Sequence, residues 1–149
     1  MKILMVCLGN ICRSPLAHGI LQAKVDRLGL NWEIDSAGTS SWHVGGSPDQ
    51  RSVDIAKANG IDISHQRARK VLVSDLKYFE FLFVMDASNY QAVASLDTKN
   101  IYKSKIKLIL NSVYPDENRA VPDPYYNNGF EEVYDLLDQA TDEIIRKFT

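Results

Sequence analysis

The sequence predicts an α/β fold in which a parallel sheet lies between two layers of helices. Short apolar runs of strand length alternate along the chain with longer stretches whose apolar residues recur at helical spacing. Strands separated by helices pair in parallel through right-handed crossovers, and the helices then cover both faces of the sheet. The chain has 149 residues, 45% of them hydrophobic, with no linker or internal repeat, so we expect one domain over residues 1–149.

Two strands and two helices are predicted in the first half of the chain. Residues 2–7 are an apolar run typical of a buried strand, and residues 15–28 place their apolar side chains on one helical face before a glycine ends the pattern. Residues 32–34 predict a second short strand. The Gly- and Ser-rich stretch 37–47 predicts a loop, and residues 48–58 predict a helix that ends at an Asn-Gly pair.

The second half of the chain repeats this alternation. Residues 81–85 predict an apolar strand, residues 87–96 a helix, and residues 106–110 the last strand. Residues 130–147 predict a final helix, because their apolar positions share one face, acidic residues come early and basic residues come late, as the helix dipole favours. Such sheets bind ligands at the carboxyl ends of their strands, where the first predicted strand places Cys7.

The most informative segment for chemistry is Cys7-Leu8-Gly9-Asn10-Ile11-Cys12-Arg13-Ser14, between the first predicted strand and the first predicted helix. A strand that turns directly into a helix points backbone N–H groups and the positive end of the helix dipole at one place, where an oxyanion can bind. The same field favours a thiolate over a thiol. We therefore expect Cys7 to be an ionised nucleophile that attacks phosphorus.

The other residues of this loop have separate expected tasks. Gly9 can adopt a positive φ and lets the backbone close around a ligand, and Asn10 tolerates left-handed geometry. Arg13 presents a planar fork of donors that fits two phosphoryl oxygens. Ser14 is expected to cap the helix, with Pro15 at its first position, and to steady the sulfur as it leaves phosphorus.

The overall composition argues against several other classes of protein. The net charge is −2 and the basic residues are dispersed, so no basic face for nucleic acid is predicted. The apolar run before Cys7 is only four residues long, too short for a signal peptide or a membrane span. Two cysteines also suit a reducing compartment, so a cytoplasmic protein is expected. A zinc site would need ligands from His18, His43 and His65, which show no recognisable spacing.

Further motifs stand at intervals along the rest of the chain. They are Asp35-Ser36-Ala37-Gly38, Trp42 with Val44-Gly45 and Ser47-Pro48-Asp49, Ile63-Ser64-His65-Gln66, Met85-Asp86 with Ser88-Asn89, and Asp123-Pro124-Tyr125-Tyr126. Together with the loop of Cys, five residues, Arg and Ser near the N-terminus, their order resembles the low-molecular-weight protein tyrosine phosphatases. The resemblance spans nearly the whole chain and implies four parallel strands in the order 2-1-3-4.

The resemblance implies a general acid and a reaction cycle. Asp123 lies between two prolines that stiffen its loop, at the place of the family's acid. The implied cycle is attack by the Cys7 thiolate, a cysteinyl-phosphate intermediate, and hydrolysis by a water that Asp123 activates. No metal or other cofactor is expected, because Arg13 and the loop N–H groups neutralise the phosphoryl charge.

The resemblance also implies supporting residues and a substrate slot. His65 is expected to form a hydrogen bond with Asn10, and Asp86 to lie beside the loop. Cys12 has two open interpretations, simple packing or a reversible disulfide with Cys7. The residues expected to line the substrate slot are Leu8, Ile11, Trp42, Tyr125 and Tyr126.

Phosphotyrosine in proteins or peptides is the substrate that this slot is expected to favour, since phosphoserine would not reach the sulfur. Ile11 resembles the tyrosine-selective branch of the family, whereas a smaller Thr accompanies phosphoarginine phosphatases. An arsenate reductase on the same fold would need further cysteines, and none follows Cys12. A phosphopeptide-binding module would typically lack the nucleophile or the acid. We expect a monomer that hydrolyses phosphotyrosine.

Overall fold

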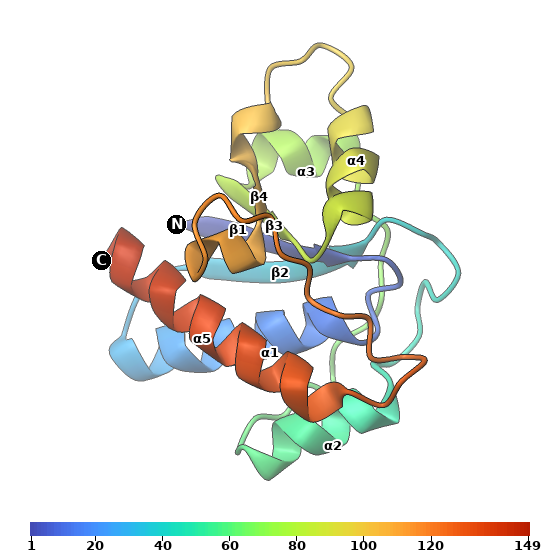
Figure 1. The fold of residues 1–149 in the computed structure, drawn as a ribbon, viewed down its shortest axis with the longest axis vertical. Coiled ribbons are helices and arrows are strands. Elements are labelled where there is room, and N and C mark those ends of the chain that lie inside the picture. The colour runs from blue at the N-terminus through green and yellow to red at the C-terminus, as the bar shows by residue number, and fades with distance from the viewer.

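The computed structural model describes residues 1–149, and its centre is one sheet of four parallel strands. The strands are β1 (Lys2–Cys7), β2 (Glu33–Gly38), β3 (Phe81–Val84) and β4 (Ile106–Leu108). Their order across the sheet is β2-β1-β3-β4, with every neighbouring pair parallel (Figure 1). The predicted α/β/α class and the strand order 2-1-3-4 are therefore confirmed.

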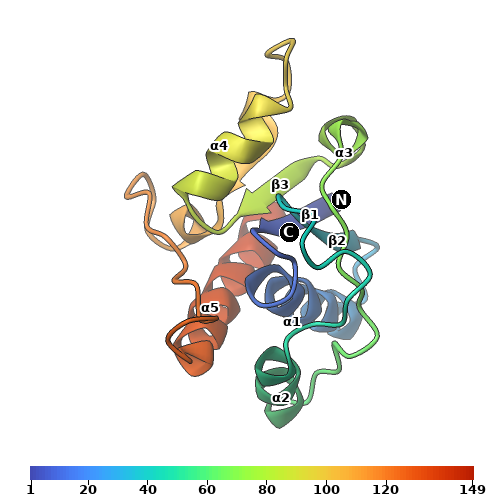
Figure 2. The same ribbon diagram turned by 90° about the vertical axis from the view of Figure 1, so that its right-hand side faces the viewer.

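Five α-helices cover the two faces of this sheet. They are α1 (Arg13–Leu28), α2 (Gln50–Ala58), α3 (Val73–Tyr78), α4 (Ala87–Ser95) and α5 (Phe130–Phe148), with two short 3-10 helices, η1 (Lys103–Lys105) and η2 (Ile109–Ser112), on either side of β4. Figures 1 and 2 show α1 and α5 on one face, α2 outside them, and α3 and α4 on the other face. None of these helices is both long and apolar enough to cross a lipid bilayer.

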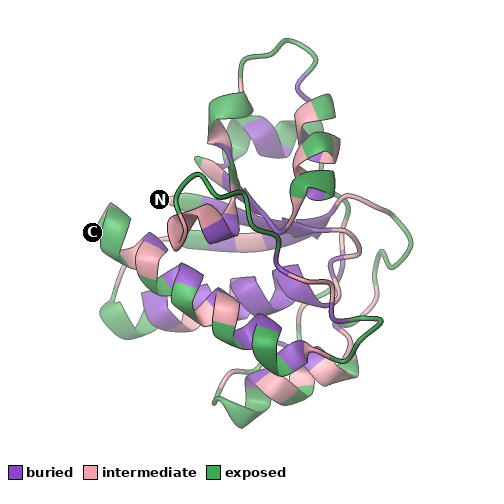
Figure 3. Ribbon diagram, in the orientation of Figure 1, coloured by how far each residue is buried: buried purple, intermediate pink, exposed green.

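β1 is buried on both of its faces because helices cover the sheet from both sides. Ile3 and Met5 belong to a core cluster that includes residues of α1 and α5, whereas Leu4 and Val6 belong to a second cluster with residues of α3 and α4. Figure 3 shows the strands and the inward faces of the helices as buried. Burial on both sides explains why the sequence of this strand is continuously apolar instead of alternating.

The helix that follows β1 begins earlier than the sequence predicts. α1 starts at Arg13, and its N-cap residue, Cys12, makes no capping hydrogen bond with its side chain. The predicted cap at Ser14, with Pro15 at the first helical position, is therefore wrong. Because the helix already begins at Arg13, Ser14 lies inside the first turn, where its hydroxyl contacts the sulfur of Cys7 instead of capping the helix.

Other boundaries also differ from the prediction. β2 continues to Gly38 because its polar and small residues pair with β1 as far as Cys7. The last strand ends at Leu108, where the chain turns into η2. The prediction lacks α3, because six residues are too few to show a helical period. This helix begins where the Asp75 carboxylate accepts a hydrogen bond from the Leu72 N–H at 2.7 Å.

Gly38, the last residue of β2, packs against the loop that follows β1. A Cβ atom at this position would lie 2.8 Å from the Leu8 carbonyl oxygen and 3.1 Å from the Asn10 nitrogen. Both are backbone atoms, which cannot rotate away as the end of a side chain can. The missing side chain at Gly38 therefore lets the end of β2 support the loop directly.

Gly38→Ala is expected to lower the free energy of unfolding by about 1–3 kcal/mol, because the methyl group overpacks the contact with the loop. Urea unfolding measures this loss. The same variant is expected to bind an inorganic oxyanion more weakly, because the displaced loop N–H groups no longer converge. Gly19→Ala is the matched control, since its Cβ would meet the Ile63 side chain at 2.4 Å, outside the loop. Wild-type stability and affinity in Gly38→Ala would contradict the contact described here.

Candidate active site

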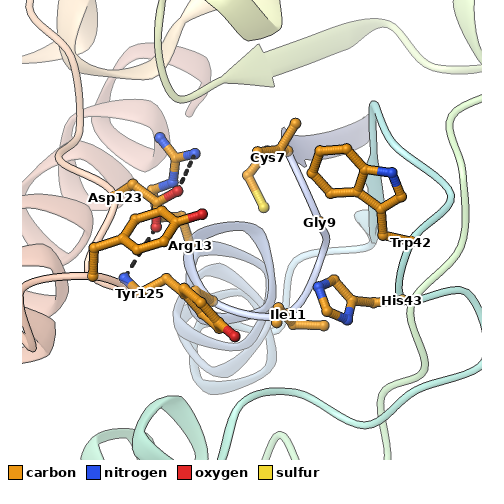
Figure 4. Close-up of a pocket in the computed structure, with 11 residues that line it drawn as sticks. Cys7, Gly9, Ile11, Arg13, Trp42, His43, Asp123 and Tyr125 are labelled. Atoms are coloured by element: carbon orange, nitrogen blue, oxygen red, sulfur yellow. Dashed lines mark hydrogen bonds and ion pairs between the residues drawn. The ribbon is translucent and has the colours of Figure 1, made fainter.

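The loop between β1 and α1 forms the floor of a pocket at the carboxyl edge of the sheet. Figure 4 shows Cys7 and the loop at its base, with Asp123 and Tyr125 on one side and Trp42 and His43 on the other. The residues that line it are Cys7, Leu8, Gly9, Ile11, Cys12, Arg13, Trp42, His43, Asp123, Tyr125 and Tyr126. The structure thus brings together the residues predicted to act on the substrate.

The Cys7 sulfur receives hydrogen-bond donors from the loop that follows it. The Asn10 N–H donates to Sγ at 3.3 Å, and Ser14 Oγ lies 3.1 Å from the same atom. Cys7 itself is almost completely buried. A sulfur held between a backbone N–H and a hydroxyl, at the N-terminus of α1, lies in surroundings that stabilise negative charge.

Asn10 determines the shape of the loop. Its φ is 55°, so the left-handed turn occurs here, and Gly9 does not have the positive φ that the sequence analysis expects. The Asn10 Nδ2 donates to Ser14 Oγ at 2.7 Å and to Ser36 Oγ at 3.0 Å. Its Oδ1 accepts from the Arg69 N–H at 3.1 Å. These three bonds fix a buried asparagine in a conformation that few other side chains adopt.

The predicted hydrogen bond between His65 and Asn10 is wrong. His65 is exposed, and the Asn10 amide is already engaged by two serine hydroxyls and a backbone N–H. The histidine that reaches this network is His18, whose Nδ1 lies 3.2 Å from Ser36 Oγ. Burial lowers the pKa of His18, partly opposed by Asp35, so its neutral form is favoured.

Arg13, the first residue of α1, is held by two acceptors from other segments. Its guanidinium donates from Nη1 to Asp86 Oδ2 at 2.7 Å and to the Val121 carbonyl oxygen at 3.1 Å. The side chain is only 3% exposed. Asp86 is itself fixed as the N-cap of α4, where it accepts from the Asn89 N–H at 2.8 Å. Asp86 therefore lies beside the site, as the sequence analysis expects, and orients Arg13.

Asp123 approaches the pocket from the segment before α5. Its Oδ2 lies 3.7 Å from Arg13 Nη2, and its Oδ1 accepts a hydrogen bond from the Tyr125 N–H at 3.0 Å (Figure 4). One third of the side chain is exposed, so a molecule in the pocket can reach it. A carboxyl group that faces both a guanidinium and open space is placed to exchange a proton with a bound ligand.

Aromatic rings form the upper walls of the pocket. Trp42 and Tyr126 are largely exposed, at 76% and 84%, and Tyr125 packs edge-on against Tyr126 with ring centroids 5.0 Å apart. His43 is a lining residue that the sequence analysis considers only as a metal ligand. Its ring lies against Gly9, where a Cβ atom would be 3.0 Å from His43 Cδ2. Only its position next to Trp42 could have pointed to it.

Cys12 lines the pocket as a buried free thiol. Burial, reinforced by the nearby Asp49 carboxylate, raises the pKa of Cys12 to about 12. This group is therefore a neutral thiol at physiological pH and not a second nucleophile. No three His, Cys, Asp or Glu side chains are grouped in a way that could hold a metal ion.

Comparisons with known proteins agree on one family. The family model described as "Low molecular weight phosphotyrosine protein phosphatase" matches residues 2–149. The low molecular weight phosphotyrosine protein phosphatase of Schizosaccharomyces pombe is 40% identical over 138 residues, which cover 89% of this chain and 87% of that protein. The crystal structure of YfkJ from Bacillus subtilis has a TM-score of 0.93 at 36% identity and covers 99% of this chain and 93% of its own. A drosophila arginine phosphatase has a TM-score of 0.92 at 30% identity, with coverage of 100% and 98%.

Proposed function

The chain belongs to the low molecular weight phosphotyrosine protein phosphatase family, and we propose that Cys7, Arg13 and Asp123 perform its reaction here. The observation that supports this proposal is the arrangement of three groups around one pocket. A sulfur with two hydrogen-bond partners lies at the floor, a buried guanidinium lies beside it, and a carboxyl group lies 3.7 Å from that guanidinium. These are the parts that phosphoryl transfer to a thiolate requires.

In the first step, the substrate's phosphoryl group binds between the loop N–H groups and Arg13. The Cys7 thiolate attacks phosphorus, an S–P bond forms, and the bond from phosphorus to the leaving oxygen breaks. Asp123 donates its proton to that oxygen, so the phenol leaves neutral. Arg13 and the loop dipoles stabilise the charge on the equatorial oxygens without reorganisation, because Asp86 and the protein backbone already fix them.

In the second step, water hydrolyses the cysteinyl phosphate. Asp123, now a carboxylate, accepts a proton from the water as its oxygen attacks phosphorus, and the S–P bond breaks to release inorganic phosphate. Ser14 Oγ, 3.1 Å from the sulfur, donates a hydrogen bond to the thiolate as it leaves. We further propose that the enzyme works as a monomer in the cytoplasm, whose reducing conditions keep Cys7 available.

The purified protein is expected to hydrolyse para-nitrophenyl phosphate in the presence of a metal chelator and to be inhibited by vanadate. Cys7→Ser is expected to abolish this turnover and to keep phosphate binding, because a serine hydroxyl stays protonated where the thiol ionises. Steady-state kinetics and calorimetric titration with phosphate measure the two properties. A protein that binds phosphate and never turns over under reducing conditions would instead be a phosphate- or phosphopeptide-binding module.

Asp123→Asn is expected to slow release of a poor leaving group by about a hundredfold or more, because the amide keeps the shape and cannot donate an acidic proton. Wild-type activity toward phenyl phosphate is expected to fall as rising pH removes the Asp123 proton. The variant is expected to lose this dependence. A pH profile of kcat/KM for both proteins makes the comparison, and an identical profile would show that another group is the acid.

Phosphotyrosine is the proposed physiological target, and the aromatic walls support it. Ile11, Trp42 and Tyr125 provide apolar area on several sides of the pocket, which suits a flat phenol ring. Phosphoarginine is the second candidate, because a drosophila arginine phosphatase is among the similar structures. A guanidinium has no apolar ring to bury, so its recognition depends more on polar partners.

Peptides of one sequence that carry phosphotyrosine, phosphoarginine or phosphoserine are expected to be hydrolysed in that order of kcat/KM. Ile11→Thr is expected to reduce the difference in kcat/KM between the phosphotyrosine and phosphoarginine peptides, because it removes apolar contact with the phenol ring. Phosphate release measures each rate. Preference of the unmodified enzyme for phosphoarginine would contradict the assignment to phosphotyrosine.

A further inference from the structure

We infer that Arg51, which is outside the pocket lining, is a positioning residue that holds the segment carrying Asp123 in its catalytic place. This inference rests on the proposed role of Asp123 as general acid. Arg51 lies in the first turn of α2, and the segment before α5 runs beside that turn (Figure 1). Nothing in the reaction described above uses Arg51, although its guanidinium donates hydrogen bonds to Asp49, Tyr125 and Asn128.

The first half of this arrangement joins Arg51 to the phosphate-binding loop. The carboxylate of Asp49 accepts from Arg51 Nε at 3.0 Å and from Arg51 Nη2 at 3.0 Å, so the pair is bidentate. Asp49 in turn donates its backbone N–H to the Ile11 carbonyl oxygen at 2.8 Å. Ser52 adds a second link, because its Oγ donates to the Cys12 carbonyl oxygen at 3.3 Å. The start of α2 is therefore fixed relative to the loop that carries Cys7.

The second half joins the same guanidinium to the segment that carries the acid. Arg51 Nη2 donates to the Tyr125 carbonyl oxygen at 3.3 Å, and Nη1 donates to Asn128 Oδ1. The guanidinium carbon also lies 4.6 Å from the centroid of the Phe130 ring and 5.6 Å from that of Tyr125. Arg51 thus contacts this segment at its middle, near its end, and at the first residue of α5.

The segment has internal bonds of its own, but these do not locate it over the pocket. The Tyr125 N–H donates to Asp123 Oδ1 at 3.0 Å, and the Asn128 N–H donates to the Pro124 carbonyl oxygen at 3.0 Å. These bonds shape the turn itself. The chain just before it is anchored at Val121, whose N–H donates to the Met85 carbonyl oxygen at 2.8 Å, but no such bond is made by the side chain of Asp123. The direct contact of Asp123 with the floor of the site is the 3.7 Å approach to Arg13 Nη2, which a bound phosphoryl group would disturb. Arg51 supplies an attachment that survives substrate binding.

The charge state of the pair suits a permanent attachment. The hydrogen bond from Arg51 lowers the pKa of Asp49, and the hydrogen bond to Asp49 raises the pKa of Arg51. Both groups therefore stay ionised over the pH range in which the enzyme would work. The ion pair of Arg51 with Asp49 is therefore kept across that pH range.

The test compares leaving groups that need the acid with leaving groups that do not. Arg51→Gln is expected to lower kcat for phenyl phosphate by about tenfold, a part of the hundredfold or more that a positioned acid contributes. With dinitrophenyl phosphate, whose phenolate leaves without a proton, kcat is expected to change less than about twofold. KM for both esters is expected to stay constant. A residue with a purely structural role would lower both rates together.

Two further variants separate charge from geometry and position. Arg51→Lys keeps the charge but cannot bridge Asp49 and two acceptors at once, so it is expected to behave like Arg51→Gln. Arg119→Gln is the matched control: Arg119 also pairs with an acid two residues earlier, at 2.7 Å from Glu117, and stacks on a tyrosine, Tyr114. It makes no hydrogen bond to residues 123–129, and its removal is expected to leave both rates unchanged. Thermal unfolding verifies that each variant is folded.

A double variant distinguishes failure of this inference from failure of the proposed acid. In an Asp123→Asn background, Arg51→Gln is expected to cause no further loss with phenyl phosphate, because there is no acid left to position. If Asp123→Asn alone slows both esters equally, Asp123 is not the acid, and the proposed role of Arg51 is wrong as well. Asp123→Asn can instead slow only phenyl phosphate, which supports Asp123 as the acid. The inference about Arg51 is then overturned if Arg51→Gln slows both esters, raises only KM, or has the same rates as Arg119→Gln.

Discussion

The left-handed turn at Asn10 is the constraint on which the site depends. This single residue adopts the left-handed turn between β1 and α1, and its own backbone N–H donates to the Cys7 sulfur. A left-handed asparagine costs conformational energy, and three hydrogen bonds, two of them to buried serines, offset that cost. Because these partners come from α1, β2 and the segment before α3, the sheet must be assembled before the loop has its final shape. Catalytic geometry is in this sense a product of the whole fold.

The supports of the loop lie on different sides of it and come from segments distant in the sequence. Gly38 presses the end of β2 against the Leu8 carbonyl, and the start of α2 holds the Ile11 and Cys12 carbonyls. The Asn10 N–H points to the Cys7 sulfur, while the carbonyl oxygens of Leu8, Ile11 and Cys12 accept hydrogen bonds from the neighbouring segments. Each of these bonds satisfies a backbone carbonyl oxygen that would otherwise lack a hydrogen-bond partner. The loop is therefore rigid without needing a large side chain inside it.

The sequence was sufficient for those features that depend on local chemistry and regular periodicity. A continuous apolar strand that runs into a helix predicts the sheet and the anion site. The place of Asp123 came from the family resemblance, because an aspartate before a proline is on its own typical of a turn. Features that depend on contacts between residues distant in the sequence could not be predicted. Whether His65 or His18 reaches the Asn10 network is decided by how α1 packs beside β2. The task of Ser14 could not be separated from helix capping, because a hydroxyl near a helix start serves either purpose.

Two carboxylates share the single guanidinium of Arg13, and their surroundings give them different tasks. Asp86 lies 2.7 Å from Arg13 and also caps α4, so both of its oxygens have donors. Asp123 is more distant at 3.7 Å and faces the pocket. A phosphoryl group that enters the pocket competes with Asp123 for Arg13 and brings its own negative charge beside the carboxyl group. The two carboxylates therefore differ in freedom: Asp123 can turn toward a bound ligand, while Asp86 keeps Arg13 aligned.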